Sequence, residues 1–317
     1  MKKVSICIPC YNEEKNIENM YQAILDEMKK EPLYDFEILF ADNASRDHSK
    51  EILKKLAARD DRVKVVINQR NFGPKRSNYN IFFRASGEAV YTMACDFQDP
   101  PAMIHELLRE WEKGNLVVFG QKTNTRENFI MRGIRTLYYK IIKYFSSINH
   151  YEHVSSLFLI DKDVVDTIEK LDDFEIDVHH LIEDLGYHVS LVPYTQEKRA
   201  AGKSSYNFFR YFDFAITELV NTSYFPLRIA TFLGTIMSIF SFIIGIVYFI
   251  YKLLFWNSFD AGLAPVVIGL FLLGSIQIMF LGIIGEYIGV LMRKITKRPL
   301  VVEEEAINFE TDNQKDD

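Results

Sequence analysis

The sequence predicts an α/β fold built on a doubly wound, mostly parallel sheet. Between residues 4 and 193, short apolar runs alternate with segments of helical periodicity, and the connections between them are short. Polar side chains follow several runs where a strand should end: Asp42, Asn71 and Asp96. The carboxyl ends of parallel strands share one edge of a sheet, where ligands bind, so we expect these side chains to converge.

The expected elements follow from the periodicity. Residues 4–9 form an apolar run that Pro9 stops, and apolar residues from 17 to 28 then recur at helical spacing. Further strands are expected at 37–41, 63–67, 89–93, 116–120, 155–160 and 189–193. Helices are expected at 47–59, at 101–113 and, after the turn at 71–76, in a segment that ends near residue 85.

The segment 91–101 contains the residues with the clearest chemistry. Asp96 follows an apolar run, and Gln98 and Asp99 come next, before two prolines that would begin a helix. A carboxylate at a strand end can hold a divalent cation, and Mg²⁺ usually binds one or two carboxylates together with substrate phosphates. An aspartate here is also a common turn residue, so the segment alone leaves both interpretations open.

The second half of the chain predicts membrane attachment. Residues 229–251 and 262–285 contain 23 and 24 residues without a formal charge, and a bilayer core needs about 20 apolar residues per helix. Arg228 precedes the first span and four cations follow the second at 293–298, which places the α/β domain and the tail in the cytoplasm. The aromatic and basic segment 204–228 predicts an amphipathic helix in the membrane interface, with a buried helix as the alternative.

The net charge of −6 comes from the end of the chain. Residues 303–317 contain seven acids and one lysine, and the rest of the chain is neutral. This composition predicts a solvated, disordered terminus, and we expect no nucleic-acid partner. With only three cysteines, a disulfide framework is not expected either.

These observations predict four parts. They are an α/β domain at 1–203, the interfacial helix at 204–228, a two-helix transmembrane domain at 229–292, and a basic-then-acidic cytoplasmic tail at 293–317. Gly285 and Gly289 form one G-x-x-x-G at the end of the second span, so packing of the two spans and packing of two protomers both remain open.

Several motifs resemble those of one enzyme family. Four segments resemble successive motifs of family 2 glycosyltransferases: residues 8–14, 42–47, 71–73 and 96–101. Residues 199–206 are similar to a loop of the polyprenyl-phosphate branch, and 285–299 resembles bacterial members that glycosylate undecaprenyl phosphate. The resemblance implies a GT-A-like fold, a nucleotide-diphosphate sugar donor, Mg²⁺ or Mn²⁺, and inversion at the anomeric carbon. It does not identify the sugar.

The resemblance also implies roles for individual residues. The nucleotide pocket would be lined by Pro9, Tyr11, Asn12, Glu13, Asp42 and Asn71. Asp96 would bind the metal, and Gln98 and Asp99 would face the sugar. Arg199 and Lys203 would border the lipid phosphate or the donor diphosphate, with Arg132 and Arg135 as further candidates for the lipid phosphate. The candidate catalytic residues are therefore Asp96, Gln98, Asp99, Arg199 and Lys203.

Two positions depart from the family pattern. Ala94 stands where the metal motif usually begins with aspartate, and Ser156 stands where an acid is common. A phosphate acceptor is already anionic near neutral pH, because the second pKa of a phosphomonoester is about 6. Such an acceptor needs little help from a general base, so the loss at Ser156 fits it better than it fits a sugar hydroxyl. The absence of an acid at both Ala94 and Ser156 also fits a protein that has lost catalytic activity.

We therefore expect an inverting glycosyltransferase of the cell membrane that forms a lipid-linked sugar for envelope glycan modification. It would use a UDP-sugar, or alternatively a GDP-sugar, and undecaprenyl phosphate. The alternative hypothesis is a catalytically silent homologue that acts as a partner or regulator in a glycan-assembly complex. A processive polysaccharide synthase is disfavoured, because two spans are few for a channel and Ala200 stands where those enzymes place tryptophan.

Overall fold

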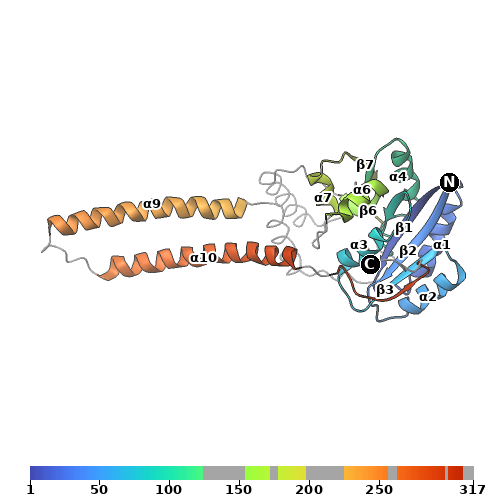
Figure 1. The fold of residues 1–317 in the computed structure, drawn as a ribbon, viewed down its shortest axis with the longest axis horizontal. Coiled ribbons are helices and arrows are strands. Elements are labelled where there is room, and N and C mark those ends of the chain that lie inside the picture. Colours follow the sequence, from blue (N-terminus) through green and yellow to red (C-terminus); the bar gives the residue numbers. More distant parts are fainter. Residues whose placement is uncertain (124–153, 172–177, 198–224, 256–262, 297–298, 310–317) are drawn as a thin grey trace, which may run out of the picture. The chain divides into compact units, whose positions relative to one another are not determined.

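The computed structural model describes residues 1–123, 154–171, 178–197, 225–255, 263–296 and 299–309 (Figure 1). The chain divides into two compact units. One unit contains a sheet with its helices and includes the C-terminal residues, and the other contains two long helices. The predicted interfacial helix lies almost wholly outside the described residues, because these resume only at Phe225.

The first unit contains an eight-stranded sheet in the order β7-β5-β6-β4-β1-β2-β3-β8. Its strands are β1 (Lys2–Cys10), β2 (Tyr34–Asp42), β3 (Val63–Asn68), β4 (Ala89–Thr92), β5 (Val117–Lys122), β6 (Val154–Asp161), β7 (Val189–Tyr194) and β8 (Glu303–Ile307). The pairs β1–β2, β1–β4, β2–β3 and β5–β7 are parallel, whereas β6 runs antiparallel to β4 and β5, and β8 runs antiparallel to β3. The predicted α/β class is confirmed, and the sheet is mixed toward both of its edges.

Helices cover both faces of this sheet. The helices α1 (Ile17–Met28), α2 (Ser49–Arg59) and α4 (Met103–Glu112) contribute to one buried cluster. The other cluster contains residues of α3 (Pro74–Phe83), α6 (Lys162–Glu169) and α7 (Val178–Asp184). The apolar runs of the strands supply side chains to both clusters, as is typical of a sheet that is buried on its two faces. All three cysteines are buried and free.

A buried carboxylate ties the amino-terminal part of the sheet together. Glu37 of β2 accepts hydrogen bonds from Ser5 Oγ at 2.5 Å and from the Ser86 backbone N–H at 2.7 Å. The ammonium groups of Lys64 and Lys3 lie 2.8 and 3.0 Å from its Oε2. Burial alone would raise the pKa of Glu37, but the bonds from Lys64, Ser5, Ser86 and Lys3 outweigh it and lower that pKa to about 2.

Stability should therefore fall steeply in acid. The carboxylate has a pKa of 4.5 in a free chain and about 2 in the fold, so its contribution is complete above pH 4.5 and is lost as the pH falls toward 2. The difference corresponds to about 3 kcal/mol. Denaturant unfolding between pH 5 and pH 2 should show this loss in the wild type and a much smaller one in Glu37→Gln. Glu88→Gln, which changes an exposed glutamate of the same region, is the control. Equal pH slopes for Glu37→Gln and the wild type would contradict this role.

The end of the chain corrects one prediction. Residues 303–317 were expected to be solvated and disordered, but Glu303–Ile307 forms β8, which pairs with the edge strand β3. Each glutamate of β8 forms an ion pair with a cation of α2 or the end of α3: Glu304 with Lys50 at 2.7 Å, Glu303 with Arg84 at 2.8 Å, and Glu305 with Lys54. For residues 303–309 the prediction was wrong because it counted charges along the chain, whereas the compensating cations and the unpaired strand edge come from distant residues; residues 310–317 lie outside the described residues.

The described part of the second unit contains α9 (Phe225–Leu254) and α10 (Leu263–Ile295). They include the first predicted span, 229–251, and residues 263–285 of the second. Many of their large apolar side chains are exposed, including Phe240 and Phe242 on α9 and Leu270 and Ile278 on α10. Within the described part of the chain, no helix has the combination of length and apolar character required to cross a membrane, so the two transmembrane helices are not confirmed.

Candidate functional site

The carboxyl ends of the first four strands bring the predicted site residues to one edge of the sheet. Cys10 at the end of β1 lies opposite Asp42 at the end of β2, and Asp42 lies opposite Ile67 of β3. On the other side of β1, β4 runs in the same direction and leads into the turn that contains Asp96. The topology therefore places the turns after β1, β2, β3 and β4 next to one another.

The turns after β1 and β2 hold each other through reciprocal hydrogen bonds. The Asn12 N–H donates to Ser45 Oγ at 2.9 Å, while Asn12 Oδ1 accepts from the Arg46 N–H at 2.8 Å. The Glu13 N–H donates to Ser49 Oγ at 2.9 Å. These bonds fix the backbone on which Asn12 and Glu13, two predicted nucleotide contacts, are placed. Tyr11 beside them is 37% exposed, so its ring is accessible to a ligand.

Unusual backbone conformations gather at this edge. Asn12, Ala44 and Phe97 have φ angles of 57°, 59° and 60°, in the left-handed region that favours glycine. Asparagine tolerates this region, but alanine and phenylalanine adopt it only where their surroundings impose it. Strained backbone of this kind clusters at ligand sites, so its presence in three adjoining turns makes this edge the candidate ligand site.

Asp42 is completely buried at the end of β2. Its Oδ2 accepts the Ser45 N–H at 3.0 Å, whereas Oδ1 is buried and has no hydrogen-bond partner among the described residues. Burial raises the pKa of this carboxyl above its ordinary value. A buried oxygen without a donor is uncommon and calls for an explanation, and a bound ligand can supply the missing donor.

Asn71 belongs to a network of side-chain amides. Asn68 Nδ2 donates to Asn43 Oδ1 at 3.2 Å, and Asn43 Nδ2 donates to Asn71 Oδ1 at 3.1 Å. The same Asn71 oxygen accepts the Gly73 N–H at 2.9 Å. Gly73 has a φ of 90° and precedes Pro74, the first residue of α3. The structure thus assigns Asn71 to the shape of the turn before α3. Sequence reasoning missed Asn43 and Asn68, although both lie at strand ends.

The turn after β4 places Asp96 and Asp99 differently. Asp96 is 6% exposed, and its Oδ1 accepts the Gln98 N–H at 3.1 Å. Asp99 is 2% exposed and accepts a hydrogen bond of 2.5 Å from the Tyr194 hydroxyl, at the end of β7. Burial raises the pKa of Asp99, against the opposing effect of the Tyr194 hydrogen bond. Gln98 is partly buried.

The other predicted site residues cannot be placed in this geometry. Arg132, Arg135, Arg199 and Lys203 lie outside the described residues. Ser156, at the position where an acid was expected, is exposed on β6. Over the described ranges, no three histidine, cysteine, aspartate or glutamate side chains form a group that could hold a metal ion.

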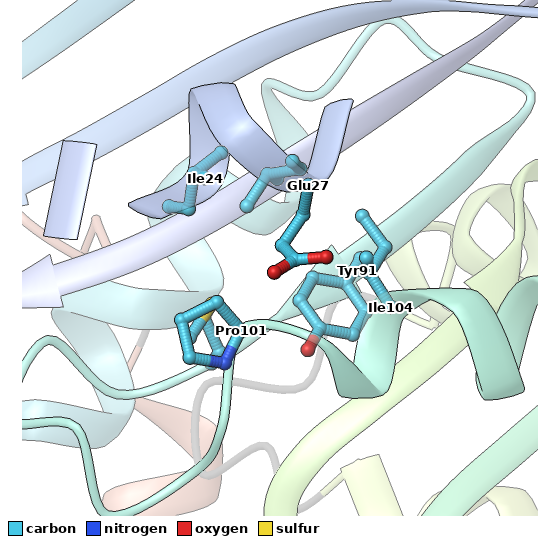
Figure 2. A pocket seen from close by; sticks show the side chains of 7 residues that line it. Ile24, Glu27, Tyr91, Pro101 and Ile104 are labelled. Atoms are coloured by element: carbon cyan, nitrogen blue, oxygen red, sulfur yellow. The ribbon is translucent and has the colours of Figure 1, made fainter. Parts of the chain in front are cut away.

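A cavity of about 10 Å³ lies on the face of the sheet covered by α1 and α4. Figure 2 shows Ile24 and Glu27 from α1 beside the Tyr91 ring of β4, with Pro101 and Ile104 next to them. This volume is close to the minimum for one water molecule, so a nucleotide sugar does not fit there. The cavity is a packing gap in the core and not part of the substrate site.

Comparisons with known proteins identify relatives along nearly the whole chain. Residues 5–168 match the family model described as glycosyl transferase family 2. The putative glycosyltransferase CsbB of Bacillus subtilis is 30% identical over 303 residues, which cover 96% of this chain and 92% of that protein. A bactoprenol glucosyl transferase of Shigella phage SfII is 28% identical over 298 residues, covering 94% of this chain and 96% of that protein.

Among solved structures, one similar chain is the mannosyltransferase PcManGT from Pyrobaculum calidifontis in complex with GDP-Man and Mn²⁺. It is 18% identical with a TM-score of 0.46, over 72% of this chain and 64% of that one. Another is S. aureus TarS 1–349, which is 18% identical with a TM-score of 0.39, over 63% of this chain and 59% of that one.

Proposed function

Because the chain belongs to glycosyl transferase family 2, we propose that it moves a sugar from a nucleotide-diphosphate sugar to a polyprenyl phosphate, with inversion at the anomeric carbon. The observation that carries this proposal is the extent of the alignment with a bactoprenol glucosyl transferase, which covers 94% of this chain. So long an alignment includes α9 and α10 as well as the sheet unit. The favoured donor is a UDP-sugar, and a GDP-sugar is the alternative.

The nucleotide would bind at the ends of β1 and β2. Asp42 Oδ1 is a completely buried acceptor without a partner among the described residues, so a base N–H or a ribose hydroxyl would supply its missing donor if the adjoining turns open to admit the nucleotide. Tyr11 offers an exposed ring in the turn after the neighbouring strand β1, and the hydrogen bonds of Asn12 and Glu13 hold that turn in place before a ligand arrives. Preorganisation of this kind reduces the free-energy cost of binding.

Asp96 is the residue that would hold Mg²⁺ or Mn²⁺. A single carboxylate fits this role, because Mg²⁺ usually binds one or two carboxylates together with substrate phosphates. The Gln98 N–H fixes one oxygen of Asp96 and so orients the carboxylate. When bound, the cation would neutralise negative charge on the leaving diphosphate. The absence of an acid at Ala94 leaves the phosphates and solvent to supply the remaining ligands.

The acceptor phosphate would be held by cations. Its own negative charge makes it the nucleophile near neutral pH, so the site needs no general base at Ser156. The candidates that would bind it are Arg199, Lys203, Arg132 and Arg135. Arginine suits a phosphate because its guanidinium donates two parallel hydrogen bonds.

The polyprenyl acceptor requires a lipid environment, and α9 and α10 supply a matching surface. Their large exposed apolar side chains are of the kind that marks a membrane or protein contact. We propose that this surface faces lipid and that the enzyme works in the cell membrane, with the sheet unit and both ends of the chain in the cytoplasm. After cell lysis the protein should sediment with membranes and be released by detergent, and not by high salt. Recovery in the soluble fraction would contradict this placement.

The alternative is a homologue without catalytic activity that serves as a partner or regulator in a glycan-assembly complex. It is favoured by Ala94 and Ser156, where acids are expected. The site retains Asp42 and Asp96, so such a protein would still bind a nucleotide.

A transfer assay separates the two functions. Protein purified in detergent is mixed with undecaprenyl phosphate, Mn²⁺ or Mg²⁺, and a panel of radiolabelled UDP- and GDP-sugars. Label should enter the lipid phase with one donor and stay in the aqueous phase when EDTA is added. Nucleotide binding without transfer from any donor would favour the regulatory homologue.

A further inference from the structure

We propose that Asp99 and Tyr194 are a positioning pair that holds the turn from Ala94 to Asp99 in the shape that Asp96 needs to meet the donor. For its catalytic consequence this inference rests on the proposed function. The family resemblance assigns Asp99 to the sugar, but its side chain is 2% exposed and bonded within the protein. Asp96, three residues earlier, remains the residue that would meet the ligand.

The first argument is the hydrogen bond between Tyr194 and Asp99. The Asp99 carboxylate accepts the Tyr194 hydroxyl at 2.5 Å. This bond anchors the turn to the end of β7. Phe97 inside this turn has a φ of 60°, a conformation that persists only where neighbouring contacts impose it. The bond from Tyr194 to Asp99 is such a contact.

The second argument is that packing fixes the position of the Tyr194 ring. Tyr194 is 5% exposed, and the backbone N–H and hydroxyl of Thr123 donate to its carbonyl oxygen at 2.9 and 3.0 Å. A Cβ added to Gly120 of the neighbouring strand β5 would lie 3.0 Å from Tyr194 Cε1 and 3.0 Å from Leu157 Cδ2. Such contacts are tighter than ordinary packing allows, so glycine makes room for the ring. The hydroxyl is therefore held at one position.

The third argument is a second bond between the same two segments. The Glu197 N–H donates to the Gln98 carbonyl oxygen at 3.0 Å. Tyr194, the last residue of β7, thus bonds to Asp99, and Glu197, just beyond the strand, bonds to Gln98. Glu197 is followed closely in sequence by Arg199 and Lys203, the proposed cations for the acceptor phosphate. These bonds join the turn that contains Asp96 to the segment that continues in the sequence to Arg199 and Lys203.

The test compares Tyr194→Phe with Tyr34→Phe. The Tyr34 hydroxyl also donates to a carboxylate at 2.5 Å, that of Glu112, but it lies at the amino end of β2, away from the site. We expect similar falls in melting temperature for the two variants. Only Tyr194→Phe should speed hydrogen exchange of the backbone amides in the peptide 94–101, by about tenfold. It should also lower kcat by about tenfold or more while the donor KM changes by less than about threefold.

The exchange measurement needs no substrate, so it decides the inference even if the wild type transfers no sugar, a result that would refute the proposed function alone. Unchanged exchange in 94–101 for Tyr194→Phe would overturn the positioning role, and so would a kcat equal to that of Tyr34→Phe in an active enzyme. Gly120→Ala provides a second variant, because it should displace the ring and keep the hydroxyl. It should raise exchange in the same peptide, and no rise would count against the pair.

Discussion

Asp96→Asn should abolish sugar transfer while leaving the fold intact. Asparagine has nearly the same volume, and its Oδ1 can still accept the Gln98 N–H, so the turn should keep its shape. What the variant loses is the negative charge that would hold the cation. A catalytic metal contributes several kcal/mol to the stabilisation of a transition state, and each 1.4 kcal/mol is tenfold in rate, so we expect a loss of about 10³-fold or more.

The measurement is the initial rate of label transfer into undecaprenyl phosphate at saturating metal, together with the melting temperature. Asp35→Asn is the matched control, because it makes the same substitution in an exposed residue near the amino end of β2. The control should keep both the wild-type rate and the wild-type melting temperature. Full activity in Asp96→Asn would rule out this residue as the metal ligand.

The second large effect is expected on stability. A chain that ends at residue 300 lacks β8, whereas a chain that ends at residue 309 retains it together with Asn308. The Asn308 side chain donates to the carbonyl oxygens of Ala57 and Val63 at 2.8 and 2.9 Å. We expect the shorter chain to lose about 3–5 kcal/mol of unfolding free energy relative to the longer one, from a ladder of several hydrogen bonds worth about 1 kcal/mol each.

Most of that loss should come from the backbone ladder. The three ion pairs of β8 are partly exposed, with side-chain exposures between 25% and 42%, and such pairs contribute about 0–1 kcal/mol each. Thermal unfolding of the two truncated proteins is the measurement, and the difference should persist when the salt concentration is raised. Equal melting temperatures would show that β8 adds nothing to the sheet unit.

The local elements followed from the sequence because their signals are local. The run expected at 37–41 is the centre of β2 (Tyr34–Asp42), and the run at 89–93 coincides with β4 (Ala89–Thr92). Apolar runs between turn residues mark buried strands whatever their partners are. The order of the motifs also predicted that Asp42 and Asp96 follow strands. The two residues then share one edge of the sheet, provided only that the strands are parallel.

The direction and pairing of strands could not be obtained in this way. The strand expected at 155–160 exists as β6, but its antiparallel course between β4 and β5 has no signature in its own residues. The acidic composition of β8 predicted disorder, but the edge of β3 offers it a backbone ladder, and Lys50, Lys54 and Arg84 offset the charge of its glutamates.

For the site, reading the sequence was enough to tell which carboxylates and amides lie at a strand end or soon after one, and so share an edge of the sheet: Asp42, Asn71 and Asp96. The part that each of them plays depends on the tertiary structure. It buries Asp42 with one oxygen lacking a partner, engages Asn71 in the shape of a turn, and joins Asp99 to Tyr194, which is 95 residues away in the chain. Hydrogen bonds over such separations depend on how strands are ordered in the sheet, and that order is set by the packing of the whole core rather than by any local pattern of residues.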